Sequence, residues 1–439
     1  MFMHYFKLGL RSLRRNPVLT GLMVMSIGMG VAASMTTWSV FRAVSGNPIP
    51  EKSAQLFTAL IDNRGPQYNY TEKGEPPEAL SYRDATALVQ AHRAKYQTLL
   101  YAVAPSVLPE GNHSLPFTAA GYATNTDFFS MFDVPFQYGS AWSAADDDHH
   151  AAVAVISHEL NAQLFGGADS VGRELTLNNH TYRIVGVTRH WNPQPRFYDL
   201  FSHMAFADPV QLYLPFTRAI DLRIDTAGRN NCGGGGVMPS GRDAWLLSEC
   251  VWIPVWVELQ DKAAVDRYRQ FLTAYADEQQ RAGRFHWAAN VRLRSVTDWL
   301  DHMHVVPPES RISLMMSVGF FVICLVNTIG LLLAKFMRRA PEIGVRRALG
   351  ASRREIYAQF LIEAATVGVA GGLLGLLLTA FGMLGVGLLF VPQIARLAHL
   401  DAALVALTLL VAVVATVVAA FYPTWRAAQV QPAWQLKTN

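Results

Sequence analysis

Four long runs of apolar residues limit what this chain of 439 residues can fold into. A helix needs about 20 apolar residues to cross a hydrocarbon core of about 30 Å. A buried helix of a soluble protein would carry charge on some face within that length. The runs hold a single charged residue, Glu363, and they are Val18–Phe41, Ile312–Ala334, Ile356–Val391 and Ala402–Tyr422. We therefore predict a membrane protein with four transmembrane α-helices.

The first run could be mistaken for a secretory signal, because basic residues precede an apolar core. It is longer than a usual signal core, and the small residues Val31–Ser34 lie inside it rather than after it. We therefore predict an uncleaved anchor. Ahead of it, Phe6, Leu10 and Leu13 have helical spacing among basic residues, which predicts a cytoplasmic amphipathic helix over residues 1–17.

Lysine and arginine gather in some of the short flanking segments and not in others. Four precede the first run and seven lie between Lys335 and Arg354, whereas the link from Pro392 to Leu400 holds only Arg396. Positively charged segments stay in the cytoplasm. We therefore predict cytoplasmic termini and a polar block between the first two spans that faces outward. The net charge of +4 lies mainly beside the membrane and gives no reason to expect nucleic acid.

The basic connector between the second and third spans is predicted to be a short helix followed by a sharp turn. Pro341 suits the first turn of a helix, Glu342 complements the positive helix start, and Gly350 can end the helix in a left-handed conformation. Ser352 and Glu355 then have the spacing of a capping box. Two interpretations remain open: the arginines only follow the positive-inside rule, or the helix is a rigid lever gripped by a cytoplasmic partner.

The same region carries a family resemblance. The sequence PEIGVRRALGASRREIYAQFLIEAATVGVAGGLLG resembles the permease subunits of MacB/FtsX-type ABC transporters. Both ends of the chain and two segments of the polar block, TNTDFFSMFDVPFQYGSAW and AVAVISHELNAQLFGGADSVGRELTLNNHTYRIVGV, are similar to that family in the same order. The resemblance implies a protein of the bacterial inner membrane whose polar block is periplasmic, and a helix that docks onto a cytoplasmic ATPase. Its coupling residues would be Pro341, Glu342, Ile343, Gly344, Val345, Arg346, Arg347, Leu349 and Gly350.

The polar block is predicted to be a large α+β domain. The order strand, helix, strand occurs near its start and again near its end, where the second motif begins with one strand over Val251–Leu259. Between them we expect mainly strands, with a hairpin turning at Asn178-Asn179. Residues 45–115 and 250–300 would form one split lobe and residues 116–249 an inserted β-rich lobe. This agrees with the split porter-like subdomain of MacB-like permeases.

The whole layout follows from these predictions. It comprises a cytoplasmic helix (1–17), a first span (18–44), a periplasmic domain (45–310), a second span (311–335), a coupling helix (336–355), a third span (356–391), a fourth span (402–423) and a cytoplasmic tail (424–439).

No catalytic chemistry is predicted for this chain. No lysine follows a glycine, which excludes a Walker A loop, and no nucleophile–base motif is recognisable. The sequence DDDHH at Asp146–His150 could bind a metal, but further ligands at suitable spacing are missing and a solvated loop is the simpler interpretation. We expect no enzyme activity, no cofactor and no metal here, with ATP and Mg²⁺ bound by a partner ATPase.

Cysteines and small residues give weaker signals. Cys232 and Cys250 lie in the outward block, where an oxidising compartment permits a disulfide. The buried Cys324 is expected to serve packing. Two GxxxG spacings in the third span allow either packing within one subunit or a dimer seam, and their residues are Gly368, Gly371, Gly372 and Gly375. Of the polar exceptions in the spans, Asn327 and Glu363, the second is expected to reach the membrane interface.

The resemblance implies a permease subunit that passes the ATP-driven movement of a separate ATPase to its periplasmic domain, for export from the periplasm. MacB itself has a fused ATPase, so a separate ATPase chain is expected here. A second copy or a paralogue would complete a dimer, and MacB-like partners include a periplasmic adaptor and an outer-membrane channel. Three alternatives remain: an FtsX-like regulator of a cell-wall hydrolase, a lipoprotein-extracting permease, and a membrane-anchored sensor.

Overall fold

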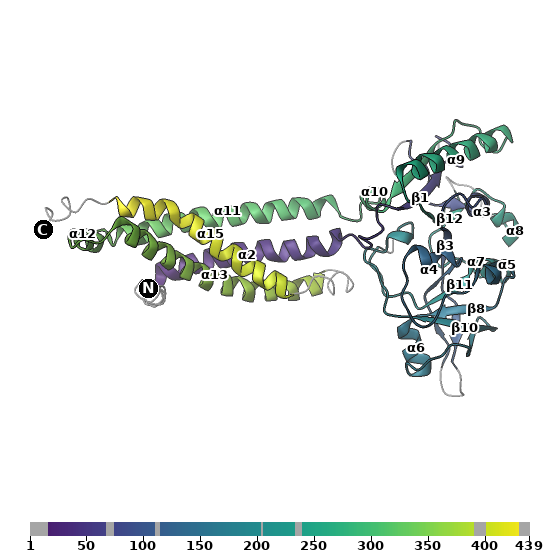
Figure 1. Cartoon of the computed structure of the whole chain (residues 1–439), viewed down its shortest axis with the longest axis horizontal. Coiled ribbons are helices and arrows are strands. Elements are labelled where there is room, and N and C mark those ends of the chain that lie inside the picture. Colours follow the sequence, from purple (N-terminus) through teal and green to yellow (C-terminus); the bar gives the residue numbers. More distant parts are fainter. Residues whose placement is uncertain are drawn as a thin grey trace. The chain divides into compact units, whose positions relative to one another are not determined.

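The computed structural model describes residues 16–66, 74–109, 115–202, 205–232, 239–389 and 401–429. The chain divides into two compact units, a mixed α/β unit of residues 46–305 and a helical unit made of the rest (Figure 1). The helix predicted at residues 1–17, apart from its last two residues, lies outside the described residues. So do the link from residue 392 to 400 and the tail beyond Gln429.

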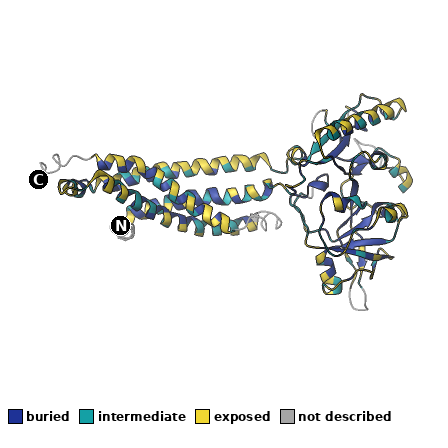
Figure 2. Ribbon diagram, viewed as in Figure 1, coloured by how far each residue is buried: buried dark blue, intermediate teal, exposed yellow. Residues whose placement is uncertain are grey.

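Four long helices and one short helix make up the described part of the helical unit (Figure 1). Each long helix is long enough and apolar enough to cross a membrane, which confirms the four predicted transmembrane helices. The five helices are α2 (Pro17–Ser45), α11 (Pro308–Met337), α12 (Ala340–Ala348), α13 (Arg353–Leu389) and α15 (Ala402–Ala428). Exposed residues cover much of the surface of α11, as Figure 2 shows.

Helix α15 continues past the predicted end of the fourth span at residue 423, although Pro423 lies inside the helix. A proline removes one backbone hydrogen bond from a helix. The turn that follows is nevertheless buried at Thr424, Ala427 and Ala428, and the two alanines share a hydrophobic cluster with Ile343 of α12. This packing keeps the start of the predicted tail helical.

Helix α13 presents glycines to two neighbours. A Cβ atom at Gly371 would lie 2.8 Å from the Ile27 side chain on α2, and one at Gly368 would lie 3.0 Å from the Val413 backbone on α15. The pairs are Gly371 with Gly375 toward α2, and Gly368 with Gly372 toward α15. Both GxxxG spacings therefore serve packing within one chain, the first of the two alternatives left by the sequence.

Replacing Gly371 with leucine is expected to destabilise the helical unit by about 1–3 kcal/mol, because a larger side chain in a filled contact forces neighbours apart. The new atoms would overlap Ile27. The measurement is the thermal midpoint of the purified chain in detergent. Gly385→Leu, on the same helix, is the matched control because a Cβ there meets no described atom within 4 Å. Equal midpoints for the two variants would contradict the packing described above.

The α/β unit begins and ends in two interlocked strand–helix–strand motifs. Strands β1 and β3 flank β13, while β13 and β14 flank β1, so each motif places a strand between those of the other. Helices α3 and α9 make the crossovers. The elements are β1 (Leu56–Ile61), α3 (Tyr82–Gln90), β3 (Gln97–Val103), β13 (Val255–Glu258), α9 (Lys262–Arg281) and β14 (Val291–Ser295).

The inserted segment extends the same sheet. Strand β3 pairs with β6, and the order continues through β11, β8, β10, β9, β4 and β5, with β7 beside β10. The predicted hairpin is confirmed, because Asn178 and Asn179 both have positive φ and join β9 to β10. These strands are β4 (Ser106–Leu108), β5 (Phe117–Thr118), β6 (Gly121–Thr124), β7 (Phe136–Gly139), β8 (Val153–Ile156), β9 (Glu174–Leu177), β10 (His180–Thr188) and β11 (Leu212–Pro215).

Two sequence interpretations of the sheet need correction. Strand β4 was expected in the split lobe of residues 45–115, yet it pairs with β9 because Val107 is fully buried beside Leu177 in the core. The stretch from Val251 to Leu259 was expected to be one strand, but Pro254 has no N–H group to donate and separates β12 (Val251–Ile253) from β13. Strand β12 pairs with β2 (Leu80–Ser81) in a separate small sheet.

Short helices and one 3-10 turn complete the α/β unit (Figure 1). They are α4 (Asp127–Met131), α5 (Ala144–Asp148), α6 (His158–Phe165), the 3-10 turn Phe197–Asp199, α7 (Phe216–Asp221), α8 (Arg242–Leu246) and α10 (Val296–His302).

Candidate functional site

Helix α12, the predicted coupling helix, has two unlike faces. Ala340, Ile343 and Gly344 are buried, and Ile343 packs in the hydrophobic cluster of the helical unit. On the opposite side Val345 is 54% exposed and Leu349 is 83% exposed. Exposed apolar side chains that lie together on one face of a helix are a feature of protein–protein contact sites.

The end of α12 and the start of α13 are capped as the sequence predicted. Gly350 has a φ of +100°, its N–H donates to Arg347 O (3.1 Å), and the next N–H, of Ala351, donates to Arg346 O (3.0 Å), which makes a Schellman motif. The capping box that opens α13 is confirmed. Ser352 N–H donates to Glu355 Oε2 at 2.9 Å, and Glu355 N–H donates to Ser352 Oγ at 3.3 Å. The turn between α12 and α13 therefore has a fixed backbone conformation.

Part of the connector's positive charge is bound within the chain. Arg346 donates to Glu342 Oε1 (2.6 Å) one turn earlier on α12 and to Gln359 Oε1 (3.0 Å) on α13. Arg347 donates to the carbonyl oxygen of Ala428 at 3.4 Å. These two arginines therefore tie α12 to α13 and α15, and the positive-inside rule alone would not require such contacts.

Glu363 does not reach the membrane interface, contrary to the sequence-based expectation. Its side chain is 3% exposed, its Oε1 lies 2.8 Å from Lys335 Nζ at the end of α11, and its Oε2 accepts from Arg339 Nη1 at 2.8 Å. A buried carboxylate is costly unless it is paired. Lys335 and Arg339 pair with the Glu363 carboxylate in the interior, so its charge does not need water at the membrane surface.

The apolar residues of α12's exposed face have one exposed arginine at their edge. Pro341 and Ala348 are exposed beside Val345 and Leu349, and Arg346 is exposed at their edge. An apolar centre with a polar, arginine-containing rim is the usual composition of a protein–protein contact.

The segments that join the two units are both anchored in one core of the α/β unit. Ile49, four residues after α2, and Trp299 on α10, shortly before α11, belong to the same buried cluster. Lys52 adds a polar anchor, since its Nζ donates to the carbonyl oxygens of Ser130 (3.1 Å) and Met131 (3.2 Å). The residues that follow α2 and precede α11 are thus firmly held.

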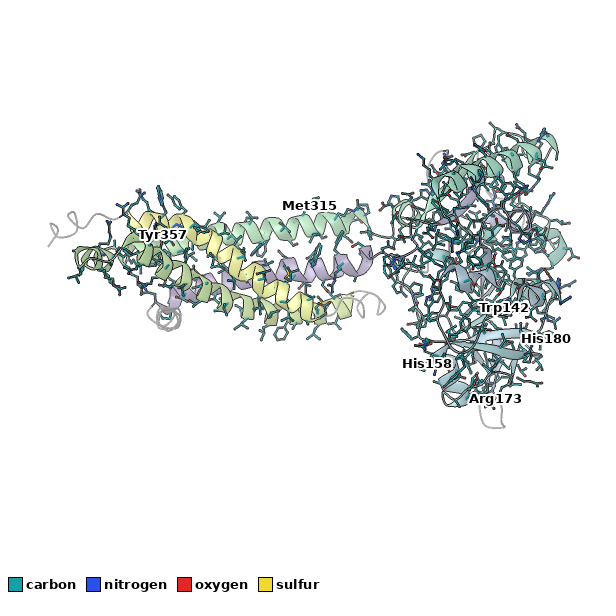
Figure 3. The ribbon with its side chains drawn as sticks, in the orientation of Figure 1. Trp142, His158, Arg173, His180, Met315 and Tyr357 are labelled. Carbon is teal, nitrogen blue, oxygen red and sulfur yellow. A yellow bond between two sulfur atoms is a disulfide. The ribbon has the colours of Figure 1, made fainter. Side chains whose placement is uncertain are left out.

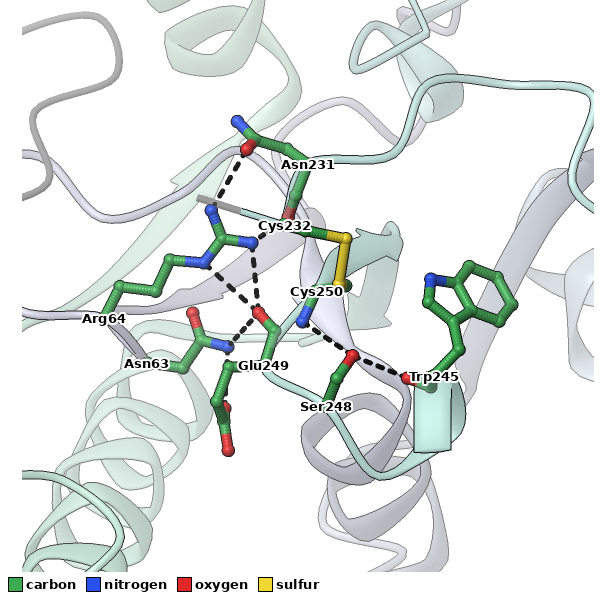
Figure 4. Close-up of a disulfide and its surroundings, with 8 residues drawn as sticks. All are labelled: Asn63, Arg64, Asn231, Cys232, Trp245, Ser248, Glu249 and Cys250. Carbon is green, nitrogen blue, oxygen red and sulfur yellow. Dashed lines mark hydrogen bonds between the residues drawn. A yellow bond between two sulfur atoms is a disulfide. The ribbon is translucent and has the colours of Figure 1, made fainter. Parts of the chain in front are cut away.

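Cys232 and Cys250 are joined in a disulfide, and Figure 4 shows its surroundings. Arg64 donates to the carbonyl oxygens of Asn231 and Glu249, the residues next to the two cysteines. The disulfide loop is therefore held by a guanidinium as well as by the covalent bond, which indicates a structural staple.

Arg284 links the same loop to helix α3. It donates to both oxygens of Asp84, at 2.7 and 2.8 Å, and to both oxygens of Glu249, at 2.7 Å each. Burial disfavours the charged guanidinium, but the hydrogen bonds to Glu249 and Asp84 outweigh it and raise the pKa of Arg284. Sequence inspection did not single out this residue.

Asp146, Asp147 and His150 of the DDDHH run each have a hydrogen-bond partner within the α/β unit. Asp146 closes a capping box with Ser143 at the start of α5. Asp147 accepts from the Thr126 N–H and from Trp142 Nε1, both at 2.8 Å, and burial raises the pKa of Asp147 to about 6 (Trp142 is labelled in Figure 3). His150 pairs with Asp221. Among the described residues, no three His, Cys, Asp or Glu side chains gather as a metal site.

Two parts of the coupling region were missed from the sequence. Gln359 was not considered, although it lies four residues before Glu363 and so on the same face of α13. Lys335 was counted only as a flanking charge, yet its side chain is 1% exposed. The available signal was a lone acid at the start of one span and a lysine at the end of the preceding span.

Comparison with known families and proteins gives the following matches. Residues 20–275 match the family described as the MacB-like periplasmic core domain, and residues 314–432 match the FtsX-like permease C-terminal family. The macrolide export ATP-binding/permease protein MacB of Azoarcus sp. (strain BH72) is 24% identical over 83% of this chain and 50% of the relative. The pyoverdine export ATP-binding/permease protein PvdT of Pseudomonas aeruginosa is 28% identical over 70% of this chain and 40% of the relative.

Among solved structures, the periplasmic region of MacB from Actinobacillus actinomycetemcomitans aligns with 58% of this chain and 94% of its own, with 14% identity and a TM-score of 0.36. The chain spans about half the length of the curated relatives it matches.

Proposed function

This chain belongs to the family of permeases with a MacB-like periplasmic core domain, since that domain alone matches more than half of its residues, and on this premise we propose that it passes ATP-driven movement to that domain. It does so as a membrane-spanning subunit of an ABC transporter. The observation that carries the proposal is helix α12, which is anchored on one face and apolar, exposed and rimmed by arginine on the other.

The proposed partner of α12 is a cytoplasmic nucleotide-binding domain that holds ATP and Mg²⁺. These 439 residues contain no Walker A loop, so ATP is hydrolysed outside them. The basic connector supports a cytoplasmic position for α12 and a periplasmic one for the α/β unit, in the bacterial inner membrane. The permease acts as a dimer with a second copy or a paralogue.

The proposed path of movement uses contacts within each unit. A push on α12 displaces α13, whose glycines lie against α2 and α15. Helix α2 is also tied to α11, because Ser26 and Ser34 donate to the carbonyl oxygens of Cys324 and Ser317 at 3.0 and 3.1 Å. The segment that follows α2 and the segment that precedes α11 are both anchored in the core cluster that contains Ile49. They therefore transmit the movement to the α/β unit.

The proposed outcome is export of a substrate from the periplasm. Relatives named for macrolide export and for pyoverdine export support export as the class of activity. A periplasmic adaptor and an outer-membrane channel would complete the route. Two alternative functions, regulation of a cell-wall hydrolase and extraction of lipoproteins, would use the same movement of α12. They differ from export in the molecule that the α/β unit would bind.

The double substitution Val345→Asp and Leu349→Asp tests the proposal. Two carboxylates on the exposed face of α12 place unpaired charge in a desolvated contact, which is expected to lower association with the ATPase by about 100-fold or more. The measurement is the ATP hydrolysis and the polypeptides that co-purify with the tagged chain from mild detergent. Leu247→Asp, at a 66% exposed leucine of the α/β unit, is the matched control. Undiminished ATPase recovery with the double variant would refute the proposal, and recovery of a cell-wall hydrolase would replace export by regulation.

A further inference from the structure

The buried carboxylate of Glu363 connects the end of α11 and the start of α12 to α13. One oxygen faces Lys335 in the last turn of α11, and the other accepts from Arg339, the residue directly before α12, both at 2.8 Å. Glu363 itself lies on α13, one helical turn after Phe360 in the hydrophobic cluster. A single side chain therefore ties the end of α11 and the start of α12 to the third span.

A second polar contact lies one turn away on the same face of α13. Gln359 accepts from Arg346 Nη1 at 3.0 Å, and Arg346 also bonds Glu342 at 2.6 Å. Since Gln359 and Glu363 are four residues apart, both point toward α12. Helix α12 is thus held near its start by Glu363 and near its end by Gln359, and Ile343 is buried between the two contacts.

Apolar packing turns one face of α12 inward but restricts the rotation of the helix less tightly than directional contacts do. Hydrophobic contact is non-directional, and a well-packed apolar cluster is often as stable as a buried ion pair. A carboxylate whose two oxygens face two different cations is satisfied in one arrangement only. The contact of Arg339 with Glu363 just before α12, together with that of Arg346 with Gln359 near its end, therefore fixes the orientation of α12 about its own axis.

We infer that Glu363 is a positioning residue that locks α12 against α13, so that force on the exposed face of α12 displaces α13 instead of turning α12. This inference rests on the proposed function for the source of the force, but the lock itself is a property of the isolated chain. Without the lock, the short helix could rotate about its axis when its outer face is pushed. With it, α12 and α13 move as one body.

The lock is tested first on the purified chain alone, in nanodiscs, by electron–electron spin distance measurements between labels at Ala348 and Arg354. Both positions are exposed, one on α12 and one on α13. The native distance distribution should be narrow. Glu363→Gln keeps the shape of the side chain and removes its charge, and the ratio of locked to unlocked chains is expected to fall about 10- to 100-fold, as for loss of a charge-assisted hydrogen bond. Gln359→Ala should broaden the distribution less.

The second measurement is made on the complex with the co-purifying ATPase. Glu363→Gln leaves Val345 and Leu349 unchanged, so the ATPase should still bind, while export per ATP hydrolysed falls about tenfold or more. Glu309→Gln, an exposed carboxyl at the start of α11, is the matched control. An unchanged, narrow distribution in Glu363→Gln and Gln359→Ala would overturn the lock. Should Glu363→Gln fail to fold, the Gln359→Ala distribution decides. Failure of the ATPase to bind the native chain would count against the proposed function instead.

Discussion

Inserting about ten glycine and serine residues between Ser45 and Gly46 is expected to abolish export while ATP hydrolysis continues. Helix α2 ends at Ser45, and the chain is anchored again at Ile49, so only a few residues separate the helix from its anchor. A Gly/Ser segment of about ten residues is a flexible coil with an end-to-end distance of about 17 Å and no fixed direction. It would absorb displacement of α2 by changing shape. The measurement is export per ATP hydrolysed, by the chain and its ATPase reconstituted together.

The same insertion between Asn178 and Asn179 is the matched control. These residues form a tight turn between β9 and β10, far in sequence from both connections to the helical unit. Loop tips of this kind tolerate insertions. Export that survives the insertion after Ser45 would show that α2 transmits no movement, and the proposed mechanism would then fail even though the ATPase contact could remain valid.

Replacing Arg284 with methionine is expected to lower the free energy of unfolding of the α/β unit by about 3–5 kcal/mol, because it leaves a buried carboxylate without its cation. The Asp84 side chain is fully buried, and Arg284 supplies two of its hydrogen bonds. For a unit of this size, such a loss corresponds to a fall of roughly 10 °C in the unfolding midpoint. Thermal unfolding followed by tryptophan fluorescence measures it.

Arg269→Met is the control for Arg284→Met. Arg269 pairs with Asp266 on the exposed side of α9, where both side chains are about half exposed. Exposed pairs of this kind contribute little to stability. Adding Asp84→Leu to the Arg284→Met chain should recover part of the loss, since removing both partners is less costly than removing one. A midpoint for Arg284→Met that matches the control would show that the buried network does not stabilise the unit.

The elements of the fold that depend on local patterns could be predicted from the sequence. The four spans, the Asn178-Asn179 hairpin and the Ser352 capping box each depend on residues close together in the chain, and each is present in the structure. Strand pairing could not be predicted in this way. The assignment of β4 to the wrong lobe shows why: its partner β9 lies about 70 residues away, and Val107 is buried only because that partner exists.

The sequence by itself determined that the chain enters a membrane and that a short, capped, arginine-rich helix lies between the second and third spans. Hydrocarbon length, charge placement and helix capping are properties of neighbouring residues. Tertiary structure decided the rest of the site. It placed Glu363 in the interior between Lys335 and Arg339 and left Leu349 exposed on α12. Whether a charge is buried and paired depends on which distant helices pack together, and no local pattern records that choice.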